Sequence, residues 1–453
     1  MKVIVFGGGK TGFTLAEELT DEGHDLLVVD TNRDALLRIS EQLDVMTLLG
    51  NGASLLVQRE ADVAHSDLVI ATTASDEVNL LCCIIARRLG AKHTIVRMRN
   101  PEYSEQLAFL KDELGLSLVL NPELVAAREI FRLLQLPSFL KRDSFADGRV
   151  EIVEIHLKEN SPLVGKALKD VGSVLHARML VCAVQREGEV IIPGGDFVLL
   201  QGDKIYVTAP VTELGKLIKG LGIPQKRIRD VMLIGGSRIS YYLSRFMIEA
   251  GIEVTILESN RKRCMELAEA LPKANIINED GSVKQVLLSE GIEKADAVIP
   301  LTNIDEINLL ISMYANYINV PKVITKINRT EFIEVFLDKG IDCIVSPKTL
   351  TANDIVQYVR AMYNTVGGSV LTVHRLVDDQ VEALEFNVTK DNKYLGKSLR
   401  EIPVKPNILI ACINRGRRPI IPQGSDTIEM GDTLVVVATT HQKIFDLNDI
   451  FMD

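Results

Sequence analysis

The sequence lacks long apolar runs, paired cysteines and basic stripes, and each absence excludes a class of protein. Hydrophobic residues make up 47% of the chain, yet no run approaches the ~18 apolar residues that a membrane-spanning helix requires. The six cysteines form no Cys-x-x-Cys pair, and the seven histidines form no His-Glu-x-x-His motif. We therefore expect buried thiols in a reducing compartment, without disulfides, a metal centre or a membrane span.

The net charge and the first residues of the chain argue against two further classes, general nucleic-acid binders and secreted proteins. The formal net charge is −10, whereas a general nucleic-acid binder carries a basic surface that neutralises phosphates. Met1 and Lys2 lead into a short apolar stretch that ends at three glycines, which is too short for the apolar core of a secretory signal. The 453 residues therefore predict a cytosolic protein of several globular domains.

Internal repetition is the strongest feature that the sequence does contain. VIVFGGGKTG at 3–12 returns as VMLIGGSRIS at 231–240, and LLVVDTNR at 26–33 returns as VTILESNR at 254–261. ATTASDEVNLL at 71–81 returns as PLTNIDEINLL at 300–310. The register continues from IIPGGDFVLLQGDKIYV at 191–207 to IIPQGSDTIEMGDTLVV at 420–436. The chain is therefore predicted to be one two-part unit that is duplicated.

Each first part alternates strand and helix patterns. Short apolar runs such as VIVF at 3–6 and LVIATT at 68–73 are typical of parallel strands buried on both faces. FTLAEELTDEG at 13–23 has the apolar spacing and closing glycine of a helix. This rhythm predicts an α/β fold with a Rossmann-like, doubly wound parallel sheet. Each second part is richer in strand patterns and Gly turns, which predicts a smaller α+β domain.

The duplication gives a domain plan. We expect Rossmann-like domains at 1–120 and 230–346, connecting helices at 121–146 and 347–367, and small α+β domains at 147–222 and 368–453. The charged, proline-containing segment 223–230 is the expected linker between the two copies.

The run Gly9-Lys10-Thr11 allows two interpretations. A phosphate-binding P-loop needs a glycine five residues before the one that precedes the lysine, but that position is Ile4, inside the first apolar strand. A dinucleotide-binding turn needs a strand before the glycines, a helix after them and an acid at the end of the second strand. The second interpretation fits, because Asp30 ends the second strand pattern.

The glycines and the acid then have separate expected roles. Gly7 permits the tight turn, Gly9 lets the backbone approach a pyrophosphate, and Gly12 allows close packing of helix on strand. The helix that begins near Lys10 directs free N–H groups at the phosphates. Asp30 accepts hydrogen bonds from ribose hydroxyls, which favours NAD over NADP, although the neighbouring Arg33 weakens that preference.

The second copy differs at two of these positions. Gly235 and Gly236 are kept, but Ser237 and Ser240 stand where the first copy has glycine. Glu258 still occupies the position of a ribose partner. The alternatives for this loop are an occupied dinucleotide site, a site for a different nucleotide and a purely structural turn.

Charged residues at matching positions of the two copies also have two interpretations. Arg97 and Lys326 end equivalent strands, where each cation either meets a ligand phosphate or is a solvated surface charge. Asp76 and Asp305 begin equivalent helices, where acids stabilise the helix dipole with or without a ligand.

Four features in combination resemble a known family. They are GGGKTG with Asp30, TTASDEVN, the pair RMRNPEY (97–103) and KINRTEF (326–332), and a Gly-Lys pair with IIPxG in both small domains. The whole chain resembles the TrkA-type potassium-uptake regulators, which are two RCK (regulator of potassium conductance) units in tandem. The resemblance implies a non-enzymatic nucleotide-binding subunit on the cytoplasmic face of the cell membrane. There it gates a Trk-type potassium-translocating membrane protein.

The resemblance further implies a homotetramer that binds NAD or NADH, with ATP or ADP as an alternative at the second site. It implies no nucleic-acid partner and no membrane insertion. By position, the implied ligand contacts of the first copy are Gly7, Gly8, Gly9, Lys10, Thr11, Gly12, Asp30, Thr73, Ala74 and Arg97. Those of the second copy are Gly235, Gly236, Ser237, Arg238, Ile239, Glu258, Leu301, Thr302 and Lys326.

The competing class is an NAD-dependent oxidoreductase. Such an enzyme needs a proton donor or acceptor beside the nicotinamide. His156, Lys166 and His176 are candidates in the first small domain, but only Lys166 has a counterpart in the second copy, Lys397. Duplication of the whole unit suits a ring-forming sensor better than a dehydrogenase.

Overall fold

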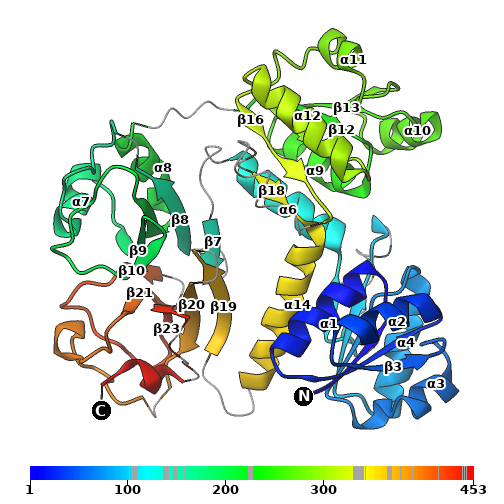
Figure 1. The fold of residues 1–453 in the computed structure, drawn as a ribbon, viewed down its shortest axis with the longest axis horizontal. Helices are drawn as coiled ribbons and strands as arrows, with labels where there is room; N and C mark the ends of the chain where they lie inside the picture. Colours follow the sequence, from blue (N-terminus) through cyan, green and yellow to red (C-terminus); the bar gives the residue numbers. More distant parts are fainter. Residues whose placement is uncertain are drawn as a thin grey trace. The chain divides into compact units, whose positions relative to one another are not determined.

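The computed structural model folds into two compact units, each of which combines segments from both halves of the chain. The first unit contains Met1–Gln135 and Ile228–Val356, and the second contains Leu136–Arg227 and Gln357–Asp453 (Figure 1). The structure describes residues 1–101, 103, 106, 111–135, 142–145, 150–157, 159–222, 228–329, 341, 343–364, 370–377, 380–389, 392–416, 418–440, 442, 444 and 446–452.

The first unit begins with a six-stranded parallel sheet in the order β3-β2-β1-β4-β5-β6. This order is that of a Rossmann fold and confirms the predicted fold class. Helices α1, α2, α3 and α4 and the short 3-10 helix η1 connect the strands. The strands are β1 Lys2–Phe6, β2 Asp25–Asp30, β3 Met46–Leu49, β4 Leu68–Ala71, β5 His93–Arg97 and β6 Leu118–Leu120; the helices are α1 Lys10–Asp21, α2 Arg33–Gln42, α3 Leu55–Glu60, η1 Val63–His65 and α4 Asp76–Leu89.

The central strands are buried because helices cover both faces of the sheet. Val3 to Phe6 of β1 and Leu68 to Ala71 of β4 are fully inaccessible to solvent, as their unbroken apolar sequences predict. The strand order reverses between β1 and β4. The loops that follow these two strands therefore flank the crevice in which doubly wound sheets bind ligands.

The second Rossmann-like domain repeats this plan with the strand order β14-β13-β12-β15-β16. A separate parallel pair, β17 with β18, follows the last strand of the sheet. The strands are β12 Asp230–Ile234, β13 Glu253–Leu257, β14 Asn275–Ile277, β15 Ala297–Pro300, β16 Lys322–Val323, β17 Thr325–Lys326 and β18 Ile344–Val345; the helices are α9 Arg238–Glu249, α10 Arg261–Ala270, α11 Lys284–Ser289 and α12 Asp305–Tyr317.

Helix α6 (Pro122–Leu134) links the two Rossmann-like domains inside the first unit. Its Ala126, Ala127 and Ile130 are buried in the same core as residues of α9 and of the second sheet. Asn121 caps α6 by accepting the N–H of Leu124, and its amide donates to the Tyr242 hydroxyl of α9 at 2.9 Å. Helix α6 therefore packs across the interface between the two Rossmann-like domains.

The segments expected to be connecting helices differ from that expectation in detail. Helix α6 occupies the first half of 121–146, and residues 142–145 form strand β7 (Arg142–Phe145). The repeat of α6 is α14, Pro347–Asn364. The domain limits proposed from the sequence stay predictions, and residues 223–227 of the expected linker and 365–367 of the second connecting segment lie outside the described residues.

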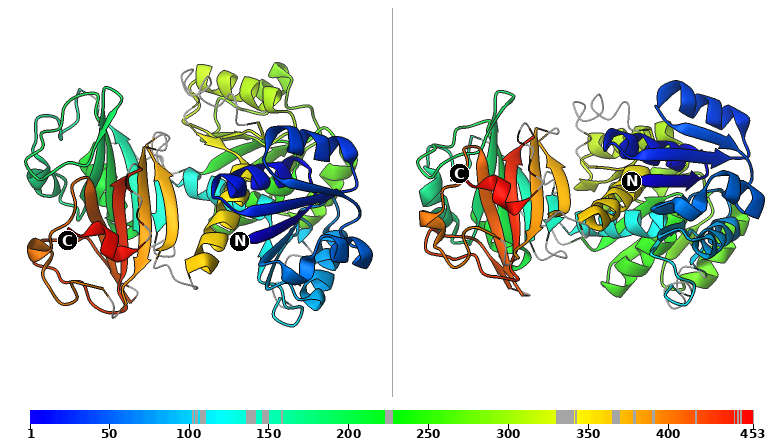
Figure 2. Two further views of the ribbon diagram at one scale, coloured as in Figure 1. Left: turned by 60° about the horizontal axis from the view of Figure 1, so that its bottom comes forward. Right: turned by 90° about the horizontal axis from the view of Figure 1, so that it is seen from below.

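The second unit contains two five-stranded antiparallel sheets, in the orders β10-β9-β11-β8-β7 and β19-β20-β23-β21-β22. Cys182 and Ala183 of the first sheet share a core with Ala411, Cys412 and other residues of the second, so the sheets pack face to face (Figure 2). The remaining elements are β8 Val150–His156, α7 Leu168–Leu175, β9 Leu180–Arg186, β10 Glu189–Ile191, β11 Lys204–Pro210, α8 Val211–Gly220, β19 Val370–Leu376, β20 Val381–Asn387, η2 Leu399–Glu401, β21 Ile408–Arg415, β22 Arg418–Ile420, β23 Thr433–Thr439 and η3 Leu447–Ile450.

Membrane-spanning helices, metal sites and disulfides bear on the class of protein. Among the residues that the structure describes, no helix combines the length and hydropathy needed to cross a membrane. Within the same residues, no three His, Cys, Asp or Glu side chains are grouped to hold a metal ion. All six cysteines are free thiols in buried positions.

Candidate functional sites

The loop between β1 and α1 requires glycine at two of its positions. Gly7 has φ of +109°, and a Cβ there would lie 2.8 Å from the carbonyl carbon of Thr72 and the nitrogen of Thr73. A Cβ at Gly12 would lie 1.8 Å from the Gly7 oxygen. Because these contacts are with backbone atoms and not with flexible side chains, this close crossing of the first turn of α1 over the loop requires glycine.

The N-terminus of α1 is open. Gly9 is the N-cap residue and provides no side-chain hydrogen bond, and a Cβ built on it would have no atom within 4 Å. The N–H groups of the first helical turn have no acceptor within the helix, and the helix dipole adds positive potential at this end. Helix α1 begins at Lys10, as predicted, and presents the arrangement that binds phosphate groups in other proteins.

Asp30 connects the end of β2 to the glycine loop. One carboxylate oxygen accepts the N–H of Gly8 at 2.6 Å, and the other accepts the N–H of Asn32 at 2.7 Å. An ionised carboxylate offers about four lone-pair sites. Two contacts therefore leave acceptor capacity for ligand hydroxyl groups beside the loop.

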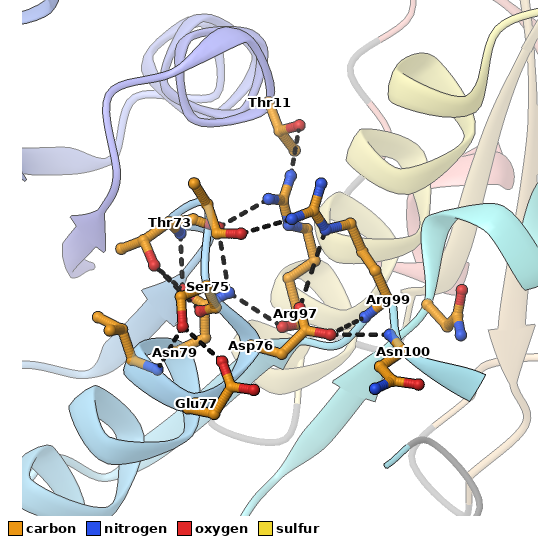
Figure 3. Close-up of polar contacts among 12 residues, drawn as sticks. Thr11, Thr73, Ser75, Asp76, Glu77, Asn79, Arg97, Arg99 and Asn100 are labelled. Carbon is orange, nitrogen blue, oxygen red and sulfur yellow. Dashed lines mark hydrogen bonds and ion pairs between the residues drawn. The ribbon is translucent and has the colours of Figure 1, made fainter. Parts of the chain in front are cut away.

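Arg97 reaches from the end of β5 across the crevice to α1 (Figure 3). Its guanidinium donates to the Thr11 hydroxyl at 3.0 Å and to the Thr73 carbonyl at 2.7 Å. Burial, and secondly the charge of Arg99, lowers the pKa of Arg97. Arg97 is therefore not a solvated surface charge, and the alternative interpretation of this residue is wrong.

Asn79 organises the loop after β4, a role that sequence reasoning missed. Its side-chain oxygen accepts the N–H and the hydroxyl of Thr73 at 2.6 and 2.7 Å, and its amide donates to the carbonyls of Thr73 and Arg97. Asn308 makes the same four contacts with Thr302 and Lys326. The signal was the asparagine that the repeats TTASDEVN and LTNIDEIN share.

Asp76 does more than begin helix α4. It is 8% exposed, and one of its oxygens accepts the N–H groups of Arg99 at 2.9 Å and Asn100 at 2.7 Å. The side chain of Arg99 in turn donates to the carbonyl of Ala74 (Figure 3). Asp305 accepts the N–H groups of Asn328 and Arg329 in the second copy. Each aspartate therefore ties the loop after β4 or β15 to the segment after the next strand.

The second glycine loop has the same outline and a different set of hydrogen bonds. Gly235 has φ of +100°, and Glu258 accepts the N–H groups of Gly236 at 2.6 Å and Asn260 at 2.7 Å. Ser237 is the N-cap of α9, and its hydroxyl accepts the N–H of Ser240 at 3.2 Å. The helix N-terminus that is open in the first site is therefore capped in the second.

A cavity of about 710 Å³ lies over the second loop. Its lining includes the loop after β12, the end of β13 and the loop after β15, which brings together most of the residues predicted for this site. Arg263, which sequence reasoning missed, also lines it and donates to the Gly236 carbonyl at 2.7 Å. The predicted residues in the lining are Gly235, Gly236, Ser237, Arg238, Glu258, Leu301 and Thr302.

Among the residues that the structure describes, Lys326, at the end of β17, has fewer hydrogen-bond partners in the second site than Arg97 has in the first. Lys326 is 6% exposed and donates to the Thr302 carbonyl at 3.0 Å. Burial lowers the pKa of Lys326, so the interpretation as a solvated surface charge is wrong here as well. Ile239 stands where the first copy has Thr11, so this position of α9 has no hydroxyl that could make the contact that Thr11 makes with Arg97.

Glu123 is a partly buried acid whose carboxyl group interacts with arginines of both candidate sites. It lies at the start of α6, and burial raises the pKa of its carboxyl group, opposed by the charges of Arg99, Arg238 and Arg97. Arg238 belongs to the second glycine loop and Arg97 to the first site. The two candidate sites therefore share an electrostatic environment inside the first unit.

These observations define a class of protein: a chain with two Rossmann-like domains in tandem, each with a dinucleotide-type turn and an acid at the end of the second strand. The TrkA-N domain matches residues 3–122 and 231–347, and the TrkA-C domain matches residues 152–222 and 383–446. The chain belongs to the TrkA family of tandem TrkA-N and TrkA-C domain proteins.

Relatives match over the full length. A Trk system potassium uptake protein TrkA homolog from Archaeoglobus fulgidus is 32% identical over 97% of this chain and 97% of its own length. A Trk system potassium uptake protein TrkA from Halomonas elongata is 30% identical over 100% of this chain and 98% of its own length. The structure of a GsuK channel bound to NAD has a TM-score of 0.63 at 19% identity, covering 97% of this chain and 77% of that chain. That structural likeness shows the fold.

Proposed function

We propose that the chain is the nucleotide-binding regulatory subunit of a Trk-type potassium uptake system. It acts without catalysis, on the cytoplasmic face of the cell membrane, by gating a potassium-translocating membrane protein. The family, whose curated members carry the name Trk system potassium uptake protein TrkA, supports this function. The observation that carries it is the open N-terminus of α1 between Asp30 and Arg97.

The first site is proposed to bind NAD or NADH. The pyrophosphate would meet the first-turn N–H groups of α1, and the adenosine ribose would meet Asp30. Arg97 donates to Thr11, so its charge lies beside the same helix terminus. The proposed contacts are Gly7, Gly8, Gly9, Lys10, Thr11, Gly12, Asp30, Thr73, Ala74 and Arg97.

The second site is proposed to bind an adenine nucleotide, with ATP or ADP preferred. The cavity over the second loop and Glu258 support this proposal. The proposed contacts are Gly235, Gly236, Ser237, Arg238, Ile239, Glu258, Leu301, Thr302 and Lys326. We further propose that four copies of the chain form a ring against the membrane protein.

The proposed regulation is a population shift. A ligand moves a conformational equilibrium only by its difference in affinity for the two states, and roughly 1–3 kcal/mol of coupling is typical. Helix α6 supplies a route for such coupling, because it follows the last strand of the first site's sheet and packs on α9, which begins at the second loop. Nucleotide binding at either loop would then change how the two domains pack.

Binding without turnover is the test of ligand and chemistry together. Purified chain is titrated with NADH, binding is followed by thermal shift and intrinsic NADH fluorescence, and NADH oxidation is followed across a substrate panel. We expect saturable binding with no oxidation. Steady turnover would overturn the proposal in favour of an oxidoreductase.

Partner binding needs a separate experiment. A pull-down from native membranes is carried out with wild-type chain and with Asp30→Ala, each with and without NADH. We expect the potassium-translocating protein to be captured, and we expect NADH to change the captured amount for the wild type alone. Failure to capture that membrane protein under any condition would contradict the proposed partner.

A further inference from the structure

The two N-cap residues, Gly9 and Ser237, share one backbone conformation and differ in side chain. Gly9 has φ of −69° and ψ of −172°, and Ser237 has φ of −67° and ψ of 172°. Both angles lie in the extended region, so serine and glycine are equally permitted at this position. At the N-cap itself the two sites therefore differ by one hydroxymethyl group and not by backbone angle.

The hydroxyl of Ser237 both accepts and donates a hydrogen bond inside the loop. It accepts the N–H of Ser240 at 3.2 Å and lies 3.0 Å from the Ser240 hydroxyl. Ser240 donates its own hydroxyl proton to the Gly235 carbonyl at 2.5 Å. Since a hydroxyl has one proton, Ser237 is the donor to Ser240. A phosphate oxygen that approached this loop would therefore meet neither the Ser240 N–H nor the Ser237 proton.

Cationic side chains remain available above the capped loop. Arg238 and Arg263 both line the cavity. Arg263 is held there by the Gly236 carbonyl at 2.7 Å and by Glu266 at 3.0 Å. A mononucleotide can turn its terminal phosphates toward these guanidinium groups. In a dinucleotide the pyrophosphate is fixed between two ribosides and must pass the helix terminus.

We propose that Ser237 is the specificity-determining residue of the second site, which it closes to the pyrophosphate of NAD(H) while leaving the site open to an adenine mononucleotide. This inference rests on the proposed function and makes it more specific. The first site binds the dinucleotide because Gly9 leaves the equivalent helix terminus uncapped. One chain then binds one NADH.

The test exchanges the two N-cap residues in the full chain. Isothermal titration with NADH is carried out on wild type, Ser237→Gly and Gly9→Ser. The Asp30→Ala background serves to isolate the second site. A Cβ at Gly9 has no atom within 4 Å, so Gly9→Ser should fold, and melting curves check this. ADP is the comparison ligand.

We expect wild type to bind one NADH per chain. Ser237→Gly should strengthen NADH binding at the second site at least tenfold, which corresponds to about 1.4 kcal/mol, in the wild-type and the Asp30→Ala backgrounds. Gly9→Ser should weaken NADH binding at the first site by a similar factor. ADP affinity at the second site should rise by a smaller factor than NADH affinity in Ser237→Gly, so the ratio of the two affinities should shift toward NADH.

Other outcomes overturn the inference in distinguishable ways. Two equal NADH sites in wild type, or a second site that Ser237→Gly leaves unchanged, would refute the role of Ser237 while the proposed function stands. Absence of NADH binding from every variant would refute the proposed dinucleotide ligand and the inference with it.

Discussion

The space available for a Cβ atom differs sharply between Gly9 and Gly12 of the first glycine loop. The Gly12 position is the most crowded, because a Cβ there would overlap the Gly7 oxygen at 1.8 Å. The Gly9 position is empty by the same measure. Two glycines of one motif therefore serve different purposes: Gly12 permits helix and strand to cross, and Gly9 leaves the helix terminus accessible.

Gly12→Ala should destabilise the first unit by roughly 1–3 kcal/mol or more, the usual cost of forcing extra atoms into a packed contact. It should also weaken NADH binding, because α1 must move away from the loop. Gly9→Ala is the matched control and should change stability by less than about 0.5 kcal/mol. Thermal melting checks both variants, and equal melting temperatures for the two would refute this account of Gly12.

The geometry of the Arg97 side chain matters as well as its charge. A guanidinium donates in several directions at once, and here it joins the Thr11 hydroxyl to the Thr73 carbonyl. Arg97→Lys keeps the charge and loses one of these bonds. We expect NADH affinity to fall about tenfold, or about 1.4 kcal/mol, in fluorescence titrations, with Thr11→Val losing less. An unchanged affinity in Arg97→Lys would show that the charge alone is sufficient.

At the scale of elements, the repeat predicts the strands and helices well and their mutual packing poorly. The apolar run 3–6, the glycines and Asp30 were sufficient to predict β1, the start of α1 and the end of β2. These features can be predicted locally, because a strand buried on both faces requires apolar residues and a turn that needs backbone freedom requires glycine. The prediction of a doubly wound parallel sheet follows from them, whereas the strand order comes from the structure.

The contacts that shape the sites were harder to predict. Asn79, Arg99 and Arg263 act through carbonyl groups of distant loops. Nothing in their own spacing identifies which carbonyl they reach, since that depends on how parallel strands align at the sheet edge. Asp76 illustrates the difficulty. An acid at the start of a helix is explained by the helix dipole alone, so the sequence gives no reason to expect its hydrogen bonds to Arg99 and Asn100.

The helix pair α6 and α14 carries an acid whose environment is unusual. Asp354 on α14 has its pKa raised to about 6 by burial, with Glu129 on α6 as the second cause. The unfolded value is near 3.8, so the folded state binds the proton more tightly between pH 4 and 6. Stability contributed by this group is therefore present at low pH and is lost as pH rises through about 6.

Asp354→Asn removes the titrating carboxyl group, so the loss of stability as pH rises through about 6 should disappear. At about 1.4 kcal/mol per pKa unit, the variant should be more stable than wild type by roughly 2–3 kcal/mol at pH 7.5 and by less at pH 5. Melting temperatures at the two pH values measure the difference, and Glu129→Gln should give a smaller change of the same sign. A stability difference that is independent of pH would contradict the raised pKa.

At the scale of the whole molecule, the duplication produces two kinds of pairing. Two Rossmann-like domains share a core through α6 and α9, and two antiparallel sheets share a core in the other unit. The sequence predicts the repeat, but it does not reveal that like parts pair with like. That pairing depends on apolar helix faces such as the one formed by Ala126, Ala127 and Ile130. From the sequence alone, such a face could equally well pack within its own domain.

The thiols provide a probe of both units at once. All six cysteines are buried, and burial raises the pKa of Cys182 to about 11 and that of Cys412 to about 12. Since the thiolate is the reactive form, native protein at pH 7.5 should react with a disulfide reagent far more slowly than free cysteine. Denatured protein should release six equivalents. Rapid labelling of the native chain would contradict the packing of the cores.

Potassium uptake is the most direct test of the central claim, that nucleotide binding at the first site regulates a potassium transporter. A strain that carries the cognate transporter and lacks this chain is complemented with wild type or with Asp30→Ala at matched expression. We predict that loss of the chain lowers uptake, that wild type restores it, and that Asp30→Ala does not restore its response to cellular NADH. Uptake that is unchanged by deletion of the chain would contradict the claim.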